Sequence, residues 1–330
     1  MDKIRKKYDE YRALINRRIN SLFKDSEPKS LYNPINYILD GGGKRIRPVL
    51  LLFSCEAAGG DPEIAINAAL AVEILHNFTL VHDDIMDNAD SRRGRETIHR
   101  KWDINVAILA GDNMVGLAYK SLLNTDSPNN RKIQTEFTNG IIEVCEGQSL
   151  DKEFETADTI LLEDYLKMID KKTSKLLETC AVIGAITANS DSEIINALRN
   201  YAYNLGMAFQ IQDDLLDITG EEKKFGKKIG GDLIEGKKTF LLIKSLELIK
   251  NGSDREKILE IIRNKGIKKN SDKIIPQIKK IYEDYGVIQT SRREIENYTN
   301  KAAGYINVFK NKESVQLLKW FSEMLLGRSF

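Results

Sequence analysis

Two clusters of aspartates in this sequence share the spacing D-D-x-x-D. The first spans Asp83–Asp87 (DDIMD) and the second spans Asp213–Asp217 (DDLLD). On a helix, the first and last aspartates of such a cluster lie about one turn apart on one face. Like charges at this spacing repel each other unless a cation lies between them. Both clusters follow apolar runs, so we expect them at the mouth of a buried region.

Clusters of carboxylates favour a hard cation, because Mg²⁺ and Ca²⁺ bind oxygen ligands. Mg²⁺ keeps several waters and is usually shared between one or two carboxylates and the phosphates of a substrate. A single acidic cluster is also compatible with a solvated helix end. Two clusters of identical form, about 130 residues apart in the chain, favour a metal site and a phosphate-bearing substrate.

Basic residues recur beside these clusters or on glycine turns. They lie in the segments Gly41–Pro48, Ser91–Gly94, Gly226–Lys228 and Gly236–Thr239. Glycine lets the backbone approach a ligand closely and present its N–H groups to oxyanions. Arginine binds phosphate oxygens with two parallel hydrogen bonds. The pattern therefore indicates phosphate recognition.

The number of cations exceeds the need of one diphosphate, for which about three Mg²⁺-binding carboxylates and a few cations suffice. Lys44, Arg47 and Arg93 form the surplus, and His76 lies two helical turns before Asp83. A lone histidine is more often a satisfied core residue, but the helical position of His76 falls between those of Asp83 and Asp87. The surplus suits a second diphosphate that side chains bind directly.

Bulk composition excludes several other classes. The 330 residues include 50 Lys+Arg and 49 Asp+Glu, a balance that argues against a general nucleic-acid-binding protein. No stretch reaches the roughly 18 uninterrupted apolar residues of a membrane span. The N-terminal segment lacks the apolar core of a signal peptide. We therefore expect a soluble cytoplasmic protein.

Helices must position the two clusters, because apolar residues recur at three- and four-residue spacing and only 6 prolines are present. Asp61-Pro62-Glu63 predicts a helix start, with Asp61 as the cap, and this helix runs into the first cluster. Further helices are predicted at about 104–123, 130–154, 159–189, 193–218 and 237–250.

The order of the motifs resembles that of the trans-prenyltransferases, the farnesyl and geranylgeranyl diphosphate synthase family, and is most similar to the archaeal-type geranylgeranyl synthases. The resemblance covers roughly residues 30–245. The motifs are GGKRIRP (42–48 with its preceding glycine), His76, DDIMD (83–87), RRG (92–94), AGD (110–112), GQ (147–148), KT (172–173), FQIQDD (209–214), Gly226-Lys227 and Lys237. The resemblance implies an all-α fold: one domain over residues 1–330, a bundle of about ten or more mostly antiparallel helices around a central cavity. It also implies a homodimer.

The resemblance further implies roles for individual residues. Mg²⁺, with three ions per active site, would be held by Asp83, Asp87 and Asp213, supported by Asp84, Asp214 and Asp217. The allylic diphosphate would be bound by Arg92, Lys172, Lys227 and Lys237. The isopentenyl diphosphate site would comprise Lys44, Arg47, His76 and Arg93. Lys172, Thr173 and Gln210 would be catalytic, the last two facing the allylic cation with their oxygens.

The implied reaction joins isopentenyl diphosphate to dimethylallyl, geranyl or farnesyl diphosphate without a protein general base. In the family, bulky side chains just before the first cluster limit product length. Here Phe78, five residues before Asp83, is the aromatic residue of that stretch, and Thr79 lies one helical turn before Asp83. The resemblance therefore implies a C20 product, geranylgeranyl diphosphate, with the C15 farnesyl diphosphate as the near alternative. A class I terpene cyclase and a non-catalytic synthase subunit remain rival interpretations.

Overall fold

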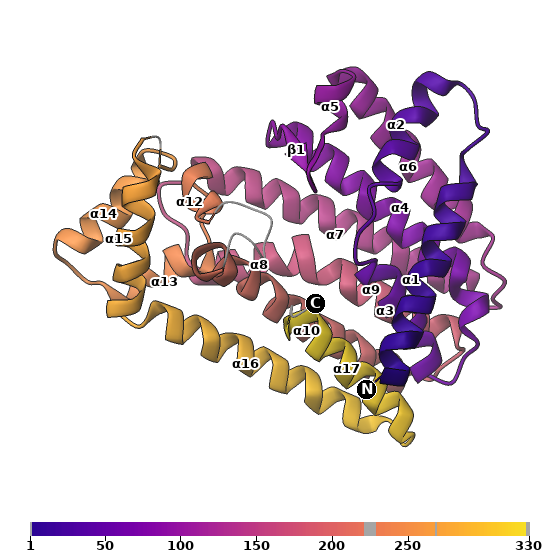
Figure 1. Ribbon diagram of the computed structural model, residues 1–330. Coiled ribbons are helices and arrows are strands. Elements are labelled where there is room, and N and C mark those ends of the chain that lie inside the picture. The colour runs from indigo at the N-terminus through magenta and orange to yellow at the C-terminus, as the bar shows by residue number, and fades with distance from the viewer. Residues whose placement is uncertain (1, 221–228, 268, 328–330) are drawn as a thin grey trace. The chain divides into compact units, whose positions relative to one another are not determined.

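The computed structural model of this protein describes residues 2–220, 229–267 and 269–327. Over these residues the chain is almost entirely helical, which confirms the all-α prediction (Figure 1). The chain divides into two compact units. Unit 1 comprises Met1–Ile141, Thr179–Arg199 and Ile306–Phe321, and unit 2 comprises Ile142–Glu178, Asn200–Tyr305 and Ser322–Phe330. That residues 1–330 form one synthase domain stays a prediction.

Unit 1 contains most of the N-terminal helices and the one short β-hairpin of the described residues. Its elements are α1 (Asp2–Leu22), α2 (Lys29–Leu39), α3 (Ile46–Ala57), α4 (Pro62–Met86), β1 (Ser91–Arg92), β2 (Arg95–Glu96), α5 (Ile98–Lys101), α6 (Ile104–Leu123) and the 3-10 turn Ile306–Val308. Four further helices contribute residues to both units: α7 (Asn130–Thr156), α9 (Lys175–Thr187), α10 (Ser192–Thr219) and α17 (Lys312–Gly327).

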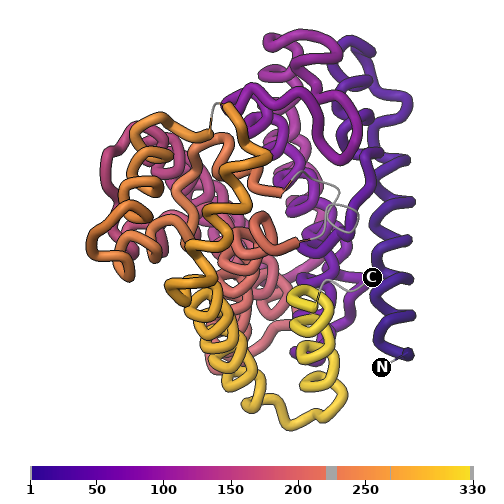
Figure 2. Tube along the Cα trace, turned by 60° about the vertical axis from the view of Figure 1, so that its left-hand side comes forward, coloured from indigo at the N-terminus to yellow at the C-terminus, as the bar shows by residue number. Residues whose placement is uncertain are grey.

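Unit 2 contains the remaining helices. They are α8 (Leu162–Ile169), the π-helix Asp170–Ser174, α12 (Gly231–Glu235), α13 (Phe240–Leu248), α14 (Ser253–Arg263), α15 (Ser271–Asp284) and α16 (Val287–Tyr305). Within this unit α13 contacts α14 and α16, and α15 contacts α16; Figure 2 shows these segments in orange and yellow. Isoleucine, leucine and tyrosine side chains, among them the buried Tyr165 and Tyr282, form its apolar core.

Helix α4 begins as the sequence predicts. The Asp61 side chain accepts a hydrogen bond from the backbone N–H of Glu63 at 3.0 Å, and Pro62 occupies the first helical position. The helix then runs through the core of unit 1, where it packs against α3 and α6 (Figure 1). Most of its length is buried, so its C-terminal turn, which carries the first acidic cluster, is held in a defined place.

Among the described residues, α4 and α6 are the two helices that are long and apolar enough to cross a membrane, judged by length and composition alone. Most of the apolar part of α4 is buried inside the protein, as in a core helix of a soluble protein. Less than half of the corresponding part of α6 is buried. Helix α6 therefore presents apolar side chains at the surface.

The segment predicted as one helix over 159–189 is interrupted. A π-helix at Asp170–Ser174 lies between α8 and α9, and it carries Lys172 and Thr173. Two glycines explain how neighbouring helices approach this wider turn. A Cβ atom on Gly147 of α7 would lie 2.3 Å from the backbone nitrogen of Lys172, and one on Gly206 of α10 would lie 2.6 Å from Cα of Ser174. Periodicity does not reveal such an insertion, because it adds a residue without changing the apolar character of the segment.

Candidate active site

Both acidic clusters lie at the C-terminal ends of helices. Helix α4 ends at Met86 with Asp87 as its C-cap, and α10 ends at Thr219, two residues after Asp217. Neither helix has a basic residue in its last turn. Carboxylates are unfavourable at this end, where the helix dipole is negative. Each cluster therefore concentrates negative charge that a bound cation would stabilise.

In the first cluster, Arg92 neutralises part of this negative charge. Its Nε donates to Asp84 at 2.7 Å, and its Nη2 lies 3.4 Å from Asp83. Asp84 is buried, and this burial raises the pKa of its carboxyl group although Arg92 opposes the shift. Asp84 is thus anchored inside the protein, whereas Asp83 and Asp87 are only half-buried.

A tight hairpin brings Arg92 to the cluster. Strands β1 and β2 are joined by Arg93 and Gly94, which both have positive φ values of 55° and 74°, as a type I′ turn requires. The reversal directs Arg92 to Asp84 and lets Arg93 donate from Nη1 to the carbonyl of Gly42. The two adjacent arginines therefore contact different segments of unit 1: Arg92 contacts the acidic cluster, and Arg93 contacts the glycine segment before α3.

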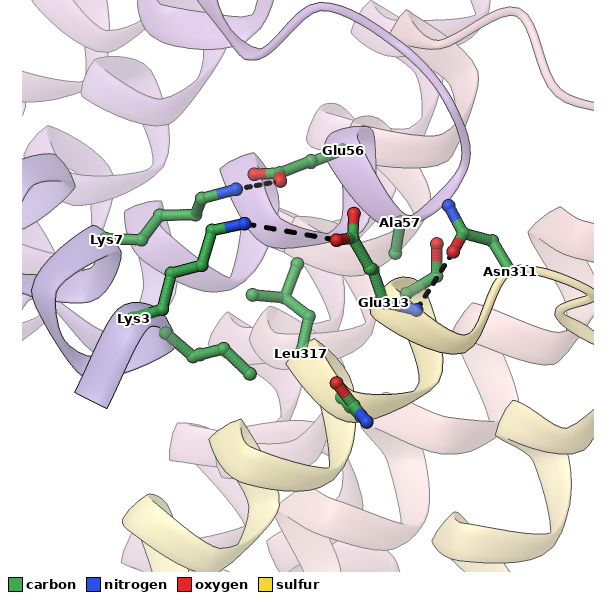
Figure 3. Close-up of a pocket in the computed structure, with 10 residues that line it drawn as sticks. Lys3, Lys7, Glu56, Ala57, Asn311, Glu313 and Leu317 are labelled. Atoms are coloured by element: carbon green, nitrogen blue, oxygen red, sulfur yellow. Dashed lines mark hydrogen bonds and ion pairs between the residues drawn. The ribbon is translucent and has the colours of Figure 1, made fainter. Parts of the chain in front are cut away.

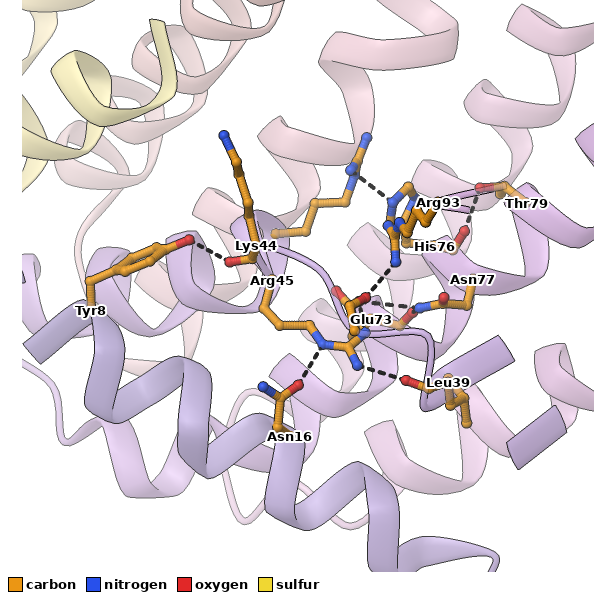
Figure 4. Close-up of polar contacts among 12 residues, drawn as sticks. Tyr8, Asn16, Leu39, Lys44, Arg45, Glu73, His76, Asn77, Thr79 and Arg93 are labelled. Atoms are coloured by element: carbon orange, nitrogen blue, oxygen red, sulfur yellow. Dashed lines mark hydrogen bonds and ion pairs between the residues drawn. The ribbon is translucent and has the colours of Figure 1, made fainter. Parts of the chain in front are cut away.

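The predicted isopentenyl diphosphate residues meet at the start of α3. Nη1 of Arg47 lies 3.1 Å from Nε2 of His76, and Arg93 lies beside them (Figure 4). Burial and the nearby Arg47 and Arg93 lower the pKa of His76 well below its ordinary value, so the ring is neutral. Nε of Arg47 is buried and has no hydrogen-bond partner within the described ranges. Lys44 is exposed beside it.

In the second cluster, Asp214 is the anchored residue. Only 4% of it is exposed, and it accepts three hydrogen bonds: from the Tyr165 hydroxyl at 2.6 Å, the Phe240 N–H at 2.8 Å and the Gln210 amide at 3.0 Å. Burial, with a smaller contribution from Asp232, raises the pKa of Asp214 to about 7. Asp214 therefore ties α10 to α8 and α13.

The other two aspartates of this cluster are half-buried. The two carboxylate oxygens of Asp217 accept backbone hydrogen bonds from Gly231 at 3.1 Å and Asp232 at 3.2 Å, at the start of α12. Asp213 lies on the turn before, in the position that Asp83 has in the first cluster.

Two of the three predicted catalytic residues, Thr173 and Gln210, are hydrogen-bonded to each other. The Thr173 hydroxyl donates to Oε1 of Gln210 at 2.8 Å, and Gln210 donates in turn to Asp214. Nζ of Lys172 lies 2.6 Å from Asp151 of α7. The two hydrogen bonds of Gln210 fix the orientation of its amide.

Two predicted diphosphate-binding lysines remain, Lys237 and Lys227. Lys237 lies 2.8 Å from Glu235, just after α12. Lys227 lies outside the described residues. Their assignments stay predictions.

The two predicted product-length residues, Phe78 and Thr79, are half-buried on α4. The ring of Phe78 packs edge-on against His82, with 4.7 Å between ring centroids. The Thr79 hydroxyl donates to the His76 carbonyl at 2.8 Å. A Cβ atom on Gly111 of α6 would lie 2.2 Å from Nε2 of His82, so Gly111 makes room for the ring that supports Phe78.

Some functional candidates were not identified from the sequence. Arg45, within the Lys44–Arg47 segment, forms a buried ion pair with Glu73 of α4. Tyr165 donates a hydrogen bond to Asp214, and Asp151 pairs with Lys172. One signal was available: Glu73 is a lone charge within the apolar run of α4. No sequence signal distinguishes Tyr165 from an ordinary core tyrosine.

The donor set fits Mg²⁺ bound together with a phosphate substrate. Within residues 2–220, 229–267 and 269–327, no three His, Cys, Asp or Glu side chains are arranged to hold a metal by themselves. Mg²⁺ does not need such a cage, because it takes one or two carboxylates and completes its shell with water and phosphate oxygens. The half-buried aspartates at both helix ends match this demand.

Two clefts in the described residues lie apart from these residues. One in unit 1, of about 270 Å³, lies between α1, α3 and α17 (Figure 3). Its charged side chains pair with one another: Lys7 with Glu56, and Lys3 with Glu313 at 3.9 Å. The other, of about 510 Å³, lies between α14 and α15 in unit 2. Neither is lined by a predicted site residue.

Comparison with known proteins gives a consistent result. The family model described as polyprenyl synthetase matches residues 28–282. A geranylgeranyl pyrophosphate synthase of Geoglobus acetivorans is 38% identical over 96% of both chains, and a geranylfarnesyl diphosphate synthase of Natronomonas pharaonis is 34% identical over 97% of this chain and 96% of its own. The crystal structure of geranylgeranyl pyrophosphate synthetase from Pyrococcus horikoshii Ot3 is similar with a TM-score of 0.92, 34% identity and 98% coverage of both chains. This chain therefore belongs to the polyprenyl synthetase family and is a prenyltransferase.

Proposed function

We propose that this protein is a short-chain prenyl diphosphate synthase that condenses isopentenyl diphosphate with allylic diphosphates and releases geranylgeranyl diphosphate. The observation that carries the proposal is the pair of intact acidic clusters, each with a buried anchoring aspartate and half-buried neighbours, in a chain of this family. One synthase domain extends over both compact units, an assignment supported by the family match through residues 28–282.

The cationic residues bind the two substrates. Lys44, Arg47 and Arg93 neutralise isopentenyl diphosphate, and the buried Nε of Arg47 supplies a donor for one of its oxygens. Neutral His76 adds a hydrogen-bonding group without adding charge. On the allylic side, Arg92 and Lys172 stabilise the charge that builds on the departing diphosphate, a transition-state effect rather than nucleophilic catalysis.

Three Mg²⁺ ions, held by Asp83, Asp87 and Asp213 with Asp84 and Asp217 in support, would neutralise the allylic diphosphate and favour its departure. The oxygens of Thr173 and Gln210 face the resulting allylic carbocation. Asp214 fixes the Gln210 amide so that its oxygen, which accepts from Thr173, keeps one orientation. The apolar faces of the surrounding helices exclude water, which would otherwise quench the cation.

One assay tests this function against its two rivals. The purified protein is incubated with radiolabelled isopentenyl diphosphate, Mg²⁺ and either dimethylallyl, geranyl or farnesyl diphosphate, and the dephosphorylated products are separated by chromatography. We expect elongation to C20, and loss of elongation with EDTA. A cyclic hydrocarbon formed from the allylic substrate alone would favour a terpene cyclase, and absence of any product would favour a non-catalytic subunit.

Phe78→Ala is expected to lengthen the products, with C25 and longer chains at the expense of C20. In this proposal the ring of Phe78, which packs against His82, closes the path of the growing chain, and its removal would open that path. Gly111→Ala should shift the products in the same direction, because the new methyl group displaces His82 from beneath Phe78. Product chromatography checks both variants, and an unchanged product ladder in Phe78→Ala would refute the assignment of Phe78.

The protein acts as a soluble cytoplasmic homodimer in which a second copy covers the exposed face of α6. Ile104, Ile108 and Leu109 are exposed on this helix, Leu109 to 60%. Exposed apolar residues at this density mark an interaction surface. We propose a second copy as the partner because another molecule of the same chain is present in any solution of the protein.

Leu109→Glu is therefore expected to convert the dimer into monomers of 37.5 kDa, because a buried unpaired charge opposes association. Size-exclusion chromatography with light scattering measures the mass. Ile64→Glu, at a similarly exposed isoleucine at the start of α4, is the matched control and should remain dimeric. A Leu109→Glu protein that stays dimeric would assign the interface to another surface.

A further inference from the structure

The segment between α2 and α3, residues 40–45, carries the glycines and the first cation of the isopentenyl diphosphate site. Its last residue, Arg45, has φ 49° and ψ 42° and is the N-cap of α3. This left-handed conformation is unfavourable for a residue with a Cβ atom. Other contacts must therefore hold Arg45 in place.

The Arg45 side chain makes those contacts with three helices. Only 3% of the residue is exposed. Nε donates to Oδ1 of Asn16 on α1 at 2.9 Å, and Nη1 donates to Oε1 of Glu73 on α4 at 2.5 Å. Nη2 donates to the carbonyl of Leu39, the last residue of α2, at 2.7 Å (Figure 4). Every nitrogen of the guanidinium group is thus bound inside unit 1, so Arg45 is not a ligand of a diphosphate.

Two more contacts hold the backbone of the same segment. The Tyr8 hydroxyl, also on α1, donates to the carbonyl of Lys44. Arg93 donates to the carbonyl of Gly42 and lies against Gly43, where a Cβ atom would be 3.0 Å from its Nη1. Gly43 has φ 135°, which is strained for other residues. Residues 42, 44 and 45 are therefore restrained from three directions.

Arg45 and its neighbours Lys44 and Arg47 lie in different surroundings. Arg45 points into unit 1, Lys44 is exposed, and Arg47 lies in the first turn of α3 within reach of His76. Helix α1 supplies two of the restraints, through Tyr8 and Asn16, and it ends before residue 28, where the family match begins. We propose that Arg45 and Tyr8 are positioning residues, through which α1 holds Lys44 and Arg47 in the geometry that binds isopentenyl diphosphate. The proposal rests on the proposed synthase activity.

The test compares two tyrosines of the same helix. Tyr8→Phe removes only the hydroxyl that holds Lys44, and Tyr11→Phe removes a hydroxyl that donates to Glu56 at 3.0 Å, away from the segment. We expect Tyr8→Phe to raise KM for isopentenyl diphosphate about fivefold, the effect of one lost hydrogen bond. KM for the allylic diphosphate should stay unchanged. Tyr11→Phe should leave both KM values unchanged, and thermal unfolding should show both variants folded.

Arg45→Lys is the stronger variant, since lysine keeps the charge but cannot form the three-way contact. It should raise KM for isopentenyl diphosphate more than tenfold, again without an equal change for the allylic substrate. If Arg45→Lys does not fold, the Tyr8→Phe comparison still decides. Equal changes in both KM values, or no change in either, would overturn the proposal while leaving the synthase assignment intact. A wild-type protein that elongates no allylic diphosphate would instead overturn the proposed function, and this proposal with it.

Discussion

Asp214→Ala is expected to lower the free energy of unfolding by about 3–5 kcal/mol. The substitution leaves the Tyr165 hydroxyl, the Phe240 N–H and the Gln210 amide without the acceptor that all three share. A buried donor without a partner costs about 1–3 kcal/mol, and the cavity left by the side chain adds to this. Equilibrium urea unfolding followed by far-ultraviolet circular dichroism measures the loss.

The neighbouring residue provides the control for this effect. Asp213→Ala removes the same side chain from a half-buried position of the same helix, and it should cost below about 1 kcal/mol. Equal destabilisation by the two alanine substitutions would contradict the distinction between an anchoring and a ligand-binding aspartate.

Asp213→Asn is expected to lower kcat by about 10²–10³ while leaving the unfolding transition in place. The amide has nearly the shape of the carboxylate but lacks the negative charge with which a carboxylate attracts Mg²⁺. Initial rates with saturating isopentenyl and farnesyl diphosphates, over a series of Mg²⁺ concentrations, measure the effect. The Mg²⁺ concentration for half-maximal rate should rise in the variant.

A different result would reassign the second cluster. If Asp213→Asn keeps a kcat within about twofold of the wild type, the carboxylate of Asp213 contributes nothing in the transition state. The rate of the Asp214→Asn protein is measured in parallel at a temperature below its unfolding transition. Because that protein is folded under these conditions, a lower rate reports loss of catalysis and not loss of fold.

In both acidic clusters the three aspartates have different structural roles. In each, the second aspartate is buried and hydrogen-bonded, Asp84 to Arg92 and Asp214 to Tyr165. Adjacent helical positions differ by about 100°, so the second aspartate points inward while the first and last lie on another face. A repeated D-D-x-x-D motif therefore combines a buried anchor with two half-buried carboxylates.

Periodicity and capping residues predicted much of the secondary structure. The helix from Asp61 into the first cluster begins as expected, and α6 spans the predicted 104–123. These elements depend on local preferences, which the sequence states directly. The π-helix at Asp170–Ser174 depends on Gly147 and Gly206 of other helices, so no local pattern predicted it.

Arg45 shows the same limit at the candidate site. Between Lys44 and Arg47 it belongs by type to a run of surface cations, yet it is buried against Glu73, 28 residues away. Pairing a buried charge with a partner so distant depends on how α1, α2 and α4 pack. The composition of the sequence and the spacing of its residues do not predict that packing.

The spacing of the aspartates, the cations near them and the order of the motifs were sufficient by themselves to predict an all-helical prenyltransferase, which the fold and the family match confirm. They also favour a Mg²⁺-type site for diphosphates, which stays a prediction. Only the tertiary structure decided which members of those motifs face inward. Asp84, Asp214 and Arg45 each have neighbours of the same residue type in the same motif, so the sequence does not distinguish them. They are buried because distant helices supply their hydrogen-bond donors and acceptors. A one-dimensional pattern specifies what a side chain can bind, and the packing of helices specifies whether it binds the protein or a ligand.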